Sequence, residues 1–176
     1  MRRIQKWGIA LAAITAGTQL NTTEACTRVV YQGKDNTVLT ARSMDWKEDT
    51  RSNLWIFPRG MKRNGEIGKN PLEWTSKYGS VVASAYDICS TDGMNEKGLV
   101  ANLLWLAESE YPQWDGKKPG LSIAAWVQYI LDNFATVDEA VSYVEKGTFE
   151  VVSDMMPDGT RMATLHLSIS DADGDN

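Results

Sequence analysis

The alternation of hydrophobic and polar positions predicts a chain that is rich in strands. Two runs of β-forming residues, 27–32 and 37–42, flank a connection of glycine, aspartate and asparagine, which predicts a hairpin. The run 99–106 is almost continuously apolar, as expected of a strand buried on both faces, whereas 164–170 alternates and predicts one buried face. A further strand is predicted over 79–86, a short apolar run at 53–57, a loop over 59–70 and a turn over 92–98.

Two helices are predicted between the strands at 99–106 and 164–170. Apolar residues recur at helical spacing through 123–134, and Ser122 is placed to cap that helix. A second helix is predicted to begin at Thr136, with Glu139 completing a capping box, and to end at Gly147. Together with the strands, these helices indicate an α+β domain.

The first 25 residues have the pattern of a secretory signal peptide. Arg2, Arg3 and Lys6 precede a short apolar stretch, and polar residues then lead to the small residue Ala25. The apolar stretch is shorter than the roughly 20 residues that span a bilayer. We therefore expect a signal peptide over 1–25 and a secreted or periplasmic domain over 26–176, with no membrane segment in the mature form.

Removal of residues 1–25 would change the formal net charge from −5 to −7, because three basic residues and one acidic residue are lost. An acidic surface disfavours nucleic acid and anionic lipid as partners, since both bind basic patches. The main physical consequence of this acidity is solubility.

Cleavage after Ala25 would make Cys26 the first residue of the mature protein. An N-terminal cysteine carries a thiol with a pKa of about 8.5 and an α-amine with a pKa of about 7.7–8.0, so the amine can accept the thiol proton. The predicted hairpin brings Arg42 and Asp45 to the end at which Cys26 lies. A guanidinium there would favour the thiolate, and a carboxylate would orient the amine.

Other interpretations of the two cysteines and the single histidine remain open. Cys26 and Cys89 could form a disulfide in an oxidising compartment, although a free buried thiol is our interpretation of Cys89. Cys26 could instead be lipidated, which would make the protein a non-enzymatic envelope lipoprotein. A papain-like pairing of Cys26 with His166 lacks the local signature of those enzymes.

Metal sites have little support in the sequence. One histidine is too few for a typical zinc site, and the alternating aspartates at 171, 173 and 175 lack the closing glutamate of a calcium loop. We therefore expect no metal.

Four segments resemble the choloylglycine hydrolase family, whose members include penicillin V acylases and conjugated bile acid hydrolases. They are residues 25–28, 41–46, 92–99 and 164–171, in the family's order. The resemblance implies a four-layer αββα N-terminal nucleophile hydrolase fold and hydrolysis of a linear, non-peptide amide, penicillin V-like or bile-acid-conjugate-like. It also implies that no cofactor is needed and that the protein forms a homotetramer.

The same resemblance assigns roles to individual residues. Cys26 matches the family's nucleophile, Arg42 the arginine that faces the thiolate, and Asp45 the aspartate beside the α-amine. Trp105 falls where relatives place a residue near the oxyanion, so its backbone N–H is a candidate donor and its indole a candidate wall of the acyl pocket. Trp46 is expected to line the same pocket.

The resemblance covers only the N-terminal part of a family domain. Relatives are longer and contribute a second oxyanion asparagine and a distal arginine from segments that would follow Asn176. The sequence therefore predicts an incomplete fold that exposes apolar strand edges, and an inactive fragment is the alternative to an active amidase.

Overall fold

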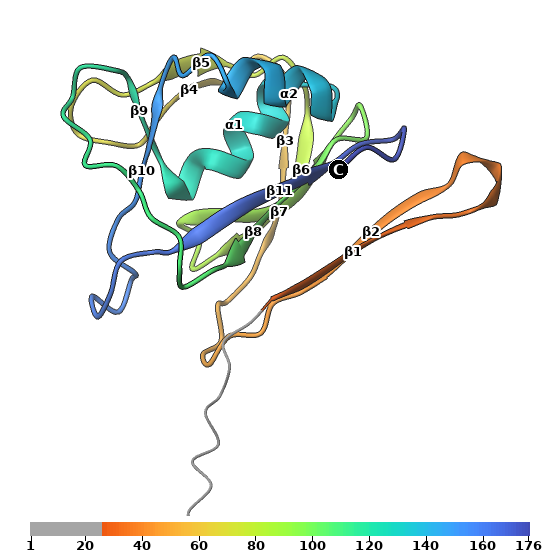
Figure 1. Ribbon diagram of the computed structural model, residues 1–176, viewed down its shortest axis with the longest axis horizontal. Helices are drawn as coiled ribbons and strands as arrows, with labels where there is room; N and C mark the ends of the chain where they lie inside the picture. The colour runs from red at the N-terminus through yellow and green to blue at the C-terminus, as the bar shows by residue number, and fades with distance from the viewer. Residues whose placement is uncertain (1–25) are drawn as a thin grey trace, which may run out of the picture.

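The computed structural model describes residues 26–176, and the predicted signal peptide lies outside them. Its largest element is an antiparallel five-stranded sheet with the strand order β11-β8-β7-β6-β3 (Figure 1). The strands are β3 (Leu54–Phe57), β6 (Ser80–Ala85), β7 (Cys89–Asn95), β8 (Val100–Trp105) and β11 (Leu165–Ser170).

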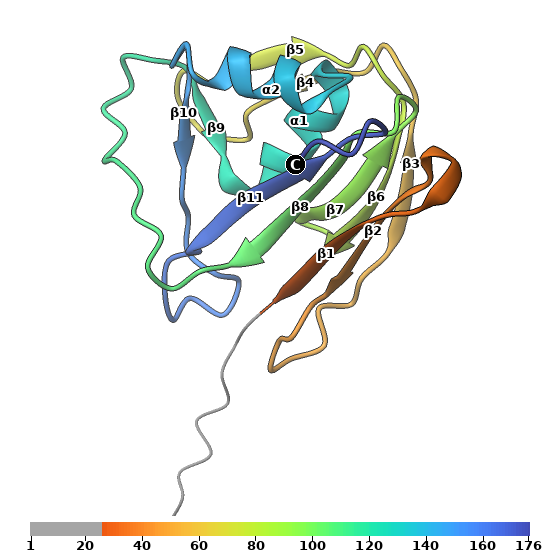
Figure 2. The same cartoon turned by 45° about the vertical axis from the view of Figure 1, so that its right-hand side comes forward.

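The predicted hairpin is confirmed. Strand β1 (Thr27–Gln32) pairs with β2 (Val38–Ser43), and Thr27 lies opposite Ser43 at the open end. A short 3₁₀ turn joins them, in which Asp35 has φ of 63°, a conformation that aspartate tolerates better than most residues. The hairpin lies across one face of the five-stranded sheet, and the two helices lie on the other (Figures 1 and 2).

Both helices begin where the sequence predicted. The hydroxyl of Ser122 accepts the N–H of Ala124 in a 3₁₀ turn (Ile123–Ala125) that leads into α1 (Trp126–Asn133). The hydroxyl of Thr136 accepts the N–H of Glu139 at the start of α2 (Val137–Val144). These caps satisfy backbone donors that have no partner within the first turn.

The hydrophobic core lies between the helices and the sheet. Alternate residues of β6 and β8 point toward α1. Residues 101–104 of the run predicted as a doubly buried strand are buried, whereas Leu106 at its end is exposed. The largest fully buried apolar side chains are Val82, Leu99, Leu103, Leu121, Val127, Ile130 and Leu131.

Two predictions of irregular structure were wrong in part. The segment predicted as a turn at 92–98 turns only after Asn95, where Gly98 has φ of 85°. As far as Asn95 it is a strand in the centre of the sheet, because Gly93 leaves room there for the Leu131 side chain. The loop predicted over 59–70 contains β4 (Lys62–Asn64), which pairs with β5 (Glu73–Thr75). The parallel pair β9 (Gly120–Ser122) and β10 (Glu150–Val152) was also missed.

The hairpin has an inverted pattern of polarity. Its outward side chains include Val29, Tyr31 and Leu39, each more than half exposed, whereas the side facing the sheet carries Arg28 and Arg42. The outward face of the hairpin is therefore apolar. Among residues 26–176, no helix has the length and apolarity needed to cross a membrane.

Candidate active site

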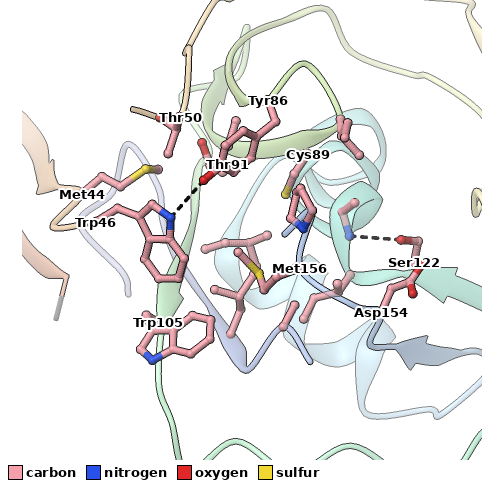
Figure 3. Close-up of a pocket in the computed structure, with 18 of the residues that line it drawn as sticks. Met44, Trp46, Thr50, Tyr86, Cys89, Thr91, Trp105, Ser122, Asp154 and Met156 are labelled. Atoms are coloured by element: carbon pink, nitrogen blue, oxygen red, sulfur yellow. Dashed lines mark hydrogen bonds between the residues drawn. The ribbon is translucent and has the colours of Figure 1, made fainter. Parts of the chain in front are cut away.

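A cavity of about 280 Å³ lies beside the open end of the hairpin, and Cys26 and Arg42 both line it. Figure 3 shows Trp46 and Trp105 on one side of this pocket and Ser122 and Asp154 on the other. The remaining wall is mostly apolar and comes from several elements, with lining residues that include Met44, Ala85, Cys89, Leu103, Ile123, Met155, Met156, Pro157 and Leu165. The structure thus gathers four of the five residues predicted from the sequence.

Two tryptophans form an aromatic wall of the cavity. The ring centroids of Trp46 and Trp105 are 5.1 Å apart at an interplanar angle of 53°, and the Trp46 indole N–H donates to the Tyr86 hydroxyl at 3.0 Å. The Arg161 guanidinium lies 4.4 Å from the Trp105 ring centroid and 5.2 Å from that of Trp46. Such cation–π contacts hold the indoles in place.

Arg42 is held by groups of the five-stranded sheet. Its side chain is 8% exposed, and its Nε lies 3.2 Å from Asp92 Oδ1. Its Nη2 also donates to the Leu103 carbonyl. The Nε contact lacks the geometry of a directed hydrogen bond, so we treat it as an ion pair.

Asp45 does not line the cavity. It follows β2, is exposed, and accepts a hydrogen bond from the Ser43 hydroxyl at 3.1 Å. The neighbouring side chains Met44 and Trp46 line the pocket instead. Its assignment to the α-amine remains a prediction from the resemblance.

Cys89 lines the same cavity, and both cysteines are free thiols, so the disulfide interpretation is wrong for this structure. Burial, with the nearby charges of Glu66 and Asp92, raises the pKa of Cys89 to about 12. Its thiol therefore stays protonated near neutral pH and is a poor nucleophile. His166 is not among the residues that line the cavity, which leaves the papain-like pairing without support.

The aspartates near the end of the chain have a structural role. The Asp171 carboxylate accepts the backbone N–H groups of Val137, Asp173 and Asp175, so it caps α2 and closes its own turn. Within residues 26–176, no three His, Cys, Asp or Glu side chains are grouped as metal ligands would be.

Comparison with known proteins identifies the family. The model of the linear amide C–N hydrolases, choloylglycine hydrolase family, matches residues 26–176. The chain belongs to this family. It is 55% identical over 177 residues to a penicillin V acylase of Pectobacterium atrosepticum, a match that covers 96% of this chain and 46% of the relative.

Solved structures of other family proteins share the fold. Penicillin V acylase from Agrobacterium tumefaciens is 64% identical with a TM-score of 0.75, over 82% of this chain and 43% of that one. A mutant of conjugated bile acid hydrolase from Clostridium perfringens is 27% identical with a TM-score of 0.68, over 85% of this chain and 46% of that one. The chain therefore spans less than half the length of these relatives, with an α+β fold of the N-terminal nucleophile hydrolase type.

Sequence reasoning missed several residues of the site. Tyr86 and Arg161 contact the indoles from segments that carry no recognisable motif. Asp92 lies in a segment that resembles the choloylglycine hydrolases, so that motif was a signal for it. Gly93 and Asn95 in the same segment favour turns, which led to the prediction of a turn there.

Proposed function

We propose that the protein hydrolyses linear, non-peptide amides and that Cys26, exposed by removal of residues 1–25, is its nucleophile. The observation that carries this proposal is the placement of Cys26 and Arg42 in one cavity, in a chain that belongs to a family of linear amide hydrolases. The protein is expected to act outside the cytoplasm, as its leader suggests.

The reaction follows from the groups at the N-terminus. The Cys26 thiol attacks the amide carbonyl while its α-amine takes up the thiol proton, and the same amine then protonates the departing nitrogen. This breaks the C–N bond and leaves an acyl-thioester on Cys26, which water hydrolyses to the free acid. The positive charge of Arg42 favours the thiolate before attack.

The cavity suggests the class of acyl group. Its wall is largely apolar, and the two indoles offer flat surfaces to an aromatic or steroid group. The relatives named above include penicillin V acylases and a conjugated bile acid hydrolase. We therefore propose acyl amides like penicillin V as the first substrates to test and conjugated bile acids as the second.

The oxyanion that forms during attack needs hydrogen-bond donors. The backbone N–H of Trp105, at the end of β8 and beside the cavity, is our candidate for one of them. Family resemblance supplies further candidates from segments beyond residue 176, and it also suggests a homotetramer.

Replacement of Cys26 by Ala in the mature protein tests the proposal, with Cys89→Ala as the matched control in the same cavity. We expect Cys26→Ala to lower kcat for penicillin V hydrolysis by about 10⁴-fold or more, since removal of a covalent nucleophile has effects of that size. Cys89→Ala should retain most of the activity. Undiminished turnover by Cys26→Ala would sink the mechanism.

The lipoprotein alternative predicts a different N-terminus. Intact mass spectrometry of the exported protein distinguishes the two, because the amidase needs an unmodified Cys26. A mass increment of diacylglyceryl size on the N-terminal peptide would support the membrane anchor instead.

A further inference from the structure

Four polar residues face one another between the hairpin and the five-stranded sheet. Arg28 and Arg42 are paired across β1 and β2, and Asp92 and Asn102 are paired across β7 and β8. Each pair lies on the side of its sheet that faces the other pair, as the contacts between them show.

The contacts form a continuous chain of interactions. Arg28 Nε donates to Asn102 Oδ1 at 2.8 Å, Asn102 Nδ2 donates to Asp92 Oδ1 at 2.8 Å, and the same Asp92 oxygen lies 3.2 Å from Arg42 Nε. Since the two arginines are also neighbours in the hairpin, the four residues close a ring that links both sheets. Loss of the Asn102 side chain would therefore release Asp92, the charged partner of Arg42.

Other contacts fix the two arginines of the ring. Arg28 Nη2 donates to the Ser170 hydroxyl at 2.7 Å, and that hydroxyl also lies 2.7 Å from Thr40 Oγ1. Arg42 is held in addition by the Leu103 carbonyl. Asp92 supplies the charged contact of Arg42, and Ser170 serves only the Arg28 end.

The charges explain why a carboxylate is needed there. Two arginines directly opposite each other in an antiparallel pair repel, and burial lowers the pKa of Arg28. One aspartate cancels one of the two positive charges and leaves the ring with an excess positive charge beside the cavity that Cys26 lines.

We propose that Asp92, fixed by Asn102, is a positioning residue that holds the Arg42 guanidinium beside Cys26. This inference rests on the proposed function, because it assigns Asp92 a part in preparing the Cys26 thiolate. Asp92 touches neither substrate nor the reacting atoms. It acts through Arg42.

Alkylation of Cys26 as a function of pH tests the proposal without any turnover. The mature protein is treated with iodoacetamide, and the Cys26 peptide is quantified by mass spectrometry in a Cys89→Ala background. The titratable or charged groups around the cavity and behind Arg42 that contribute to the profile are the Cys26 α-amine, Arg28, Arg42, Glu48, Glu66, Tyr86, Asp92, Asp154 and Arg161. These remain constant except for the substitution.

The sign of the shift separates positioning from simple charge. Loss of the Asp92 charge alone would lower the pH midpoint of alkylation, because a nearby negative charge disfavours the thiolate. Loss of positioning would raise it. We expect Asp92→Asn to raise the midpoint toward that of Arg42→Met, itself about 1 pH unit above the parent. In the Arg42→Met background, where only the charge effect remains, Asp92→Asn should not raise the midpoint.

Asn102→Ala is the second variant, and Ser170→Ala is the control. Asn102 carries no charge, so a raised midpoint in Asn102→Ala can only arise through geometry, and it decides the question if Asp92→Asn fails to fold. Among the contacts of the ring, the Ser170 hydroxyl contacts Arg28 and Thr40 but neither Asp92 nor Arg42, so Ser170→Ala should leave the midpoint unchanged. A lowered or unchanged midpoint in Asp92→Asn, or an unchanged one in Asn102→Ala, overturns the proposal.

Steady-state kinetics add a functional measurement. Asp92→Asn should lower kcat for penicillin V by at least tenfold with little change in KM, because the thiolate and not the acyl pocket is affected. A rise in KM at constant kcat would contradict the positioning role. Failure of the proposed function is distinguishable, since it would appear as full activity of Cys26→Ala whatever the alkylation profiles show.

Discussion

Replacement of Asp132 should show what holds the helical layer beside the cavity. Asp132 lies on α1 and is fully buried. Its carboxylate accepts the Trp74 indole N–H at 2.7 Å and the Gln128 amide at 2.8 Å, and it lies 3.0 Å from Arg63 Nε. It therefore ties α1 to β4 and β5, the hairpin whose loop reaches the pocket at Glu66.

The magnitude follows from the partners that a substitution would leave behind. Asp132→Ala strands two donors and an arginine that is only 17% exposed, so we expect a loss of about 3–5 kcal/mol in the free energy of unfolding. Burial raises the pKa of Asp132 despite the opposing hydrogen bonds of Trp74 and Gln128 and the charge of Arg63. Burial therefore opposes the negative charge, and Asp132→Asn, which keeps one of the two acceptor oxygens, should lose less than Asp132→Ala, about 1–2 kcal/mol.

Urea denaturation of the mature protein at pH 7, followed by tryptophan fluorescence, measures both effects. Asp115→Ala is the control, because Asp115 is exposed and pairs only with Lys117 in a surface loop, and its midpoint should not change. Equal losses for Asp132→Asn and Asp132→Ala would refute the reasoning that a retained acceptor oxygen stabilises this position.

Two further predictions concern stability. The hydrogen bond from Arg59 and the N–H of Gly79 lower the pKa of Glu96 to about 2. Glu96 therefore contributes stability that is complete above the unfolded pKa of about 4.3 and is lost as the pH falls toward 2. In acid denaturation, Glu96→Gln should flatten the dependence of stability on pH in this range, and an unchanged slope would contradict the prediction. A Cβ at position 93 would lie 2.7 Å from Leu131 Cδ1 and 2.8 Å from the Val81 carbonyl oxygen. Gly93→Ala should therefore lower the free energy of unfolding, measured by urea denaturation, by about 1–3 kcal/mol. Gly68→Ala is the control, because a Cβ there meets nothing within 4 Å and should leave the free energy of unfolding unchanged.

Local patterns were sufficient to predict much of the fold. The hairpin, the buried strand β8 and both helix starts followed from alternation, continuous apolarity and capping residues. These signals act over a few residues, so they do not depend on contacts between distant segments of the chain. Strand β7 was missed because Asp92 and Gly93 favour turns locally, and their strand conformation comes from pairing with β6 and β8 on both sides.

The candidate site was predictable only where a motif marked it. Cys26, Arg42 and Trp46 came from recognised segments and Trp105 from its spacing after one of them, and the structure places all four around one cavity. The contacts that fix Arg42 join residues far apart in the chain, and the Arg28–Ser170 bond spans 142 positions. No local pattern reports such pairs, since they form only when the hairpin is laid on the sheet.

If Cys26 is the nucleophile, it carries the acyl group during turnover, and this acyl-enzyme can be trapped. The mature protein would be mixed with penicillin V, quenched in acid within milliseconds to seconds, and digested for mass spectrometry. We predict one phenoxyacetyl adduct, confined to the peptide that begins at Cys26, lost on brief treatment with hydroxylamine and absent from Cys26→Ala. Continued turnover with no adduct at Cys26, or an adduct on Cys89 or another residue, would contradict the account.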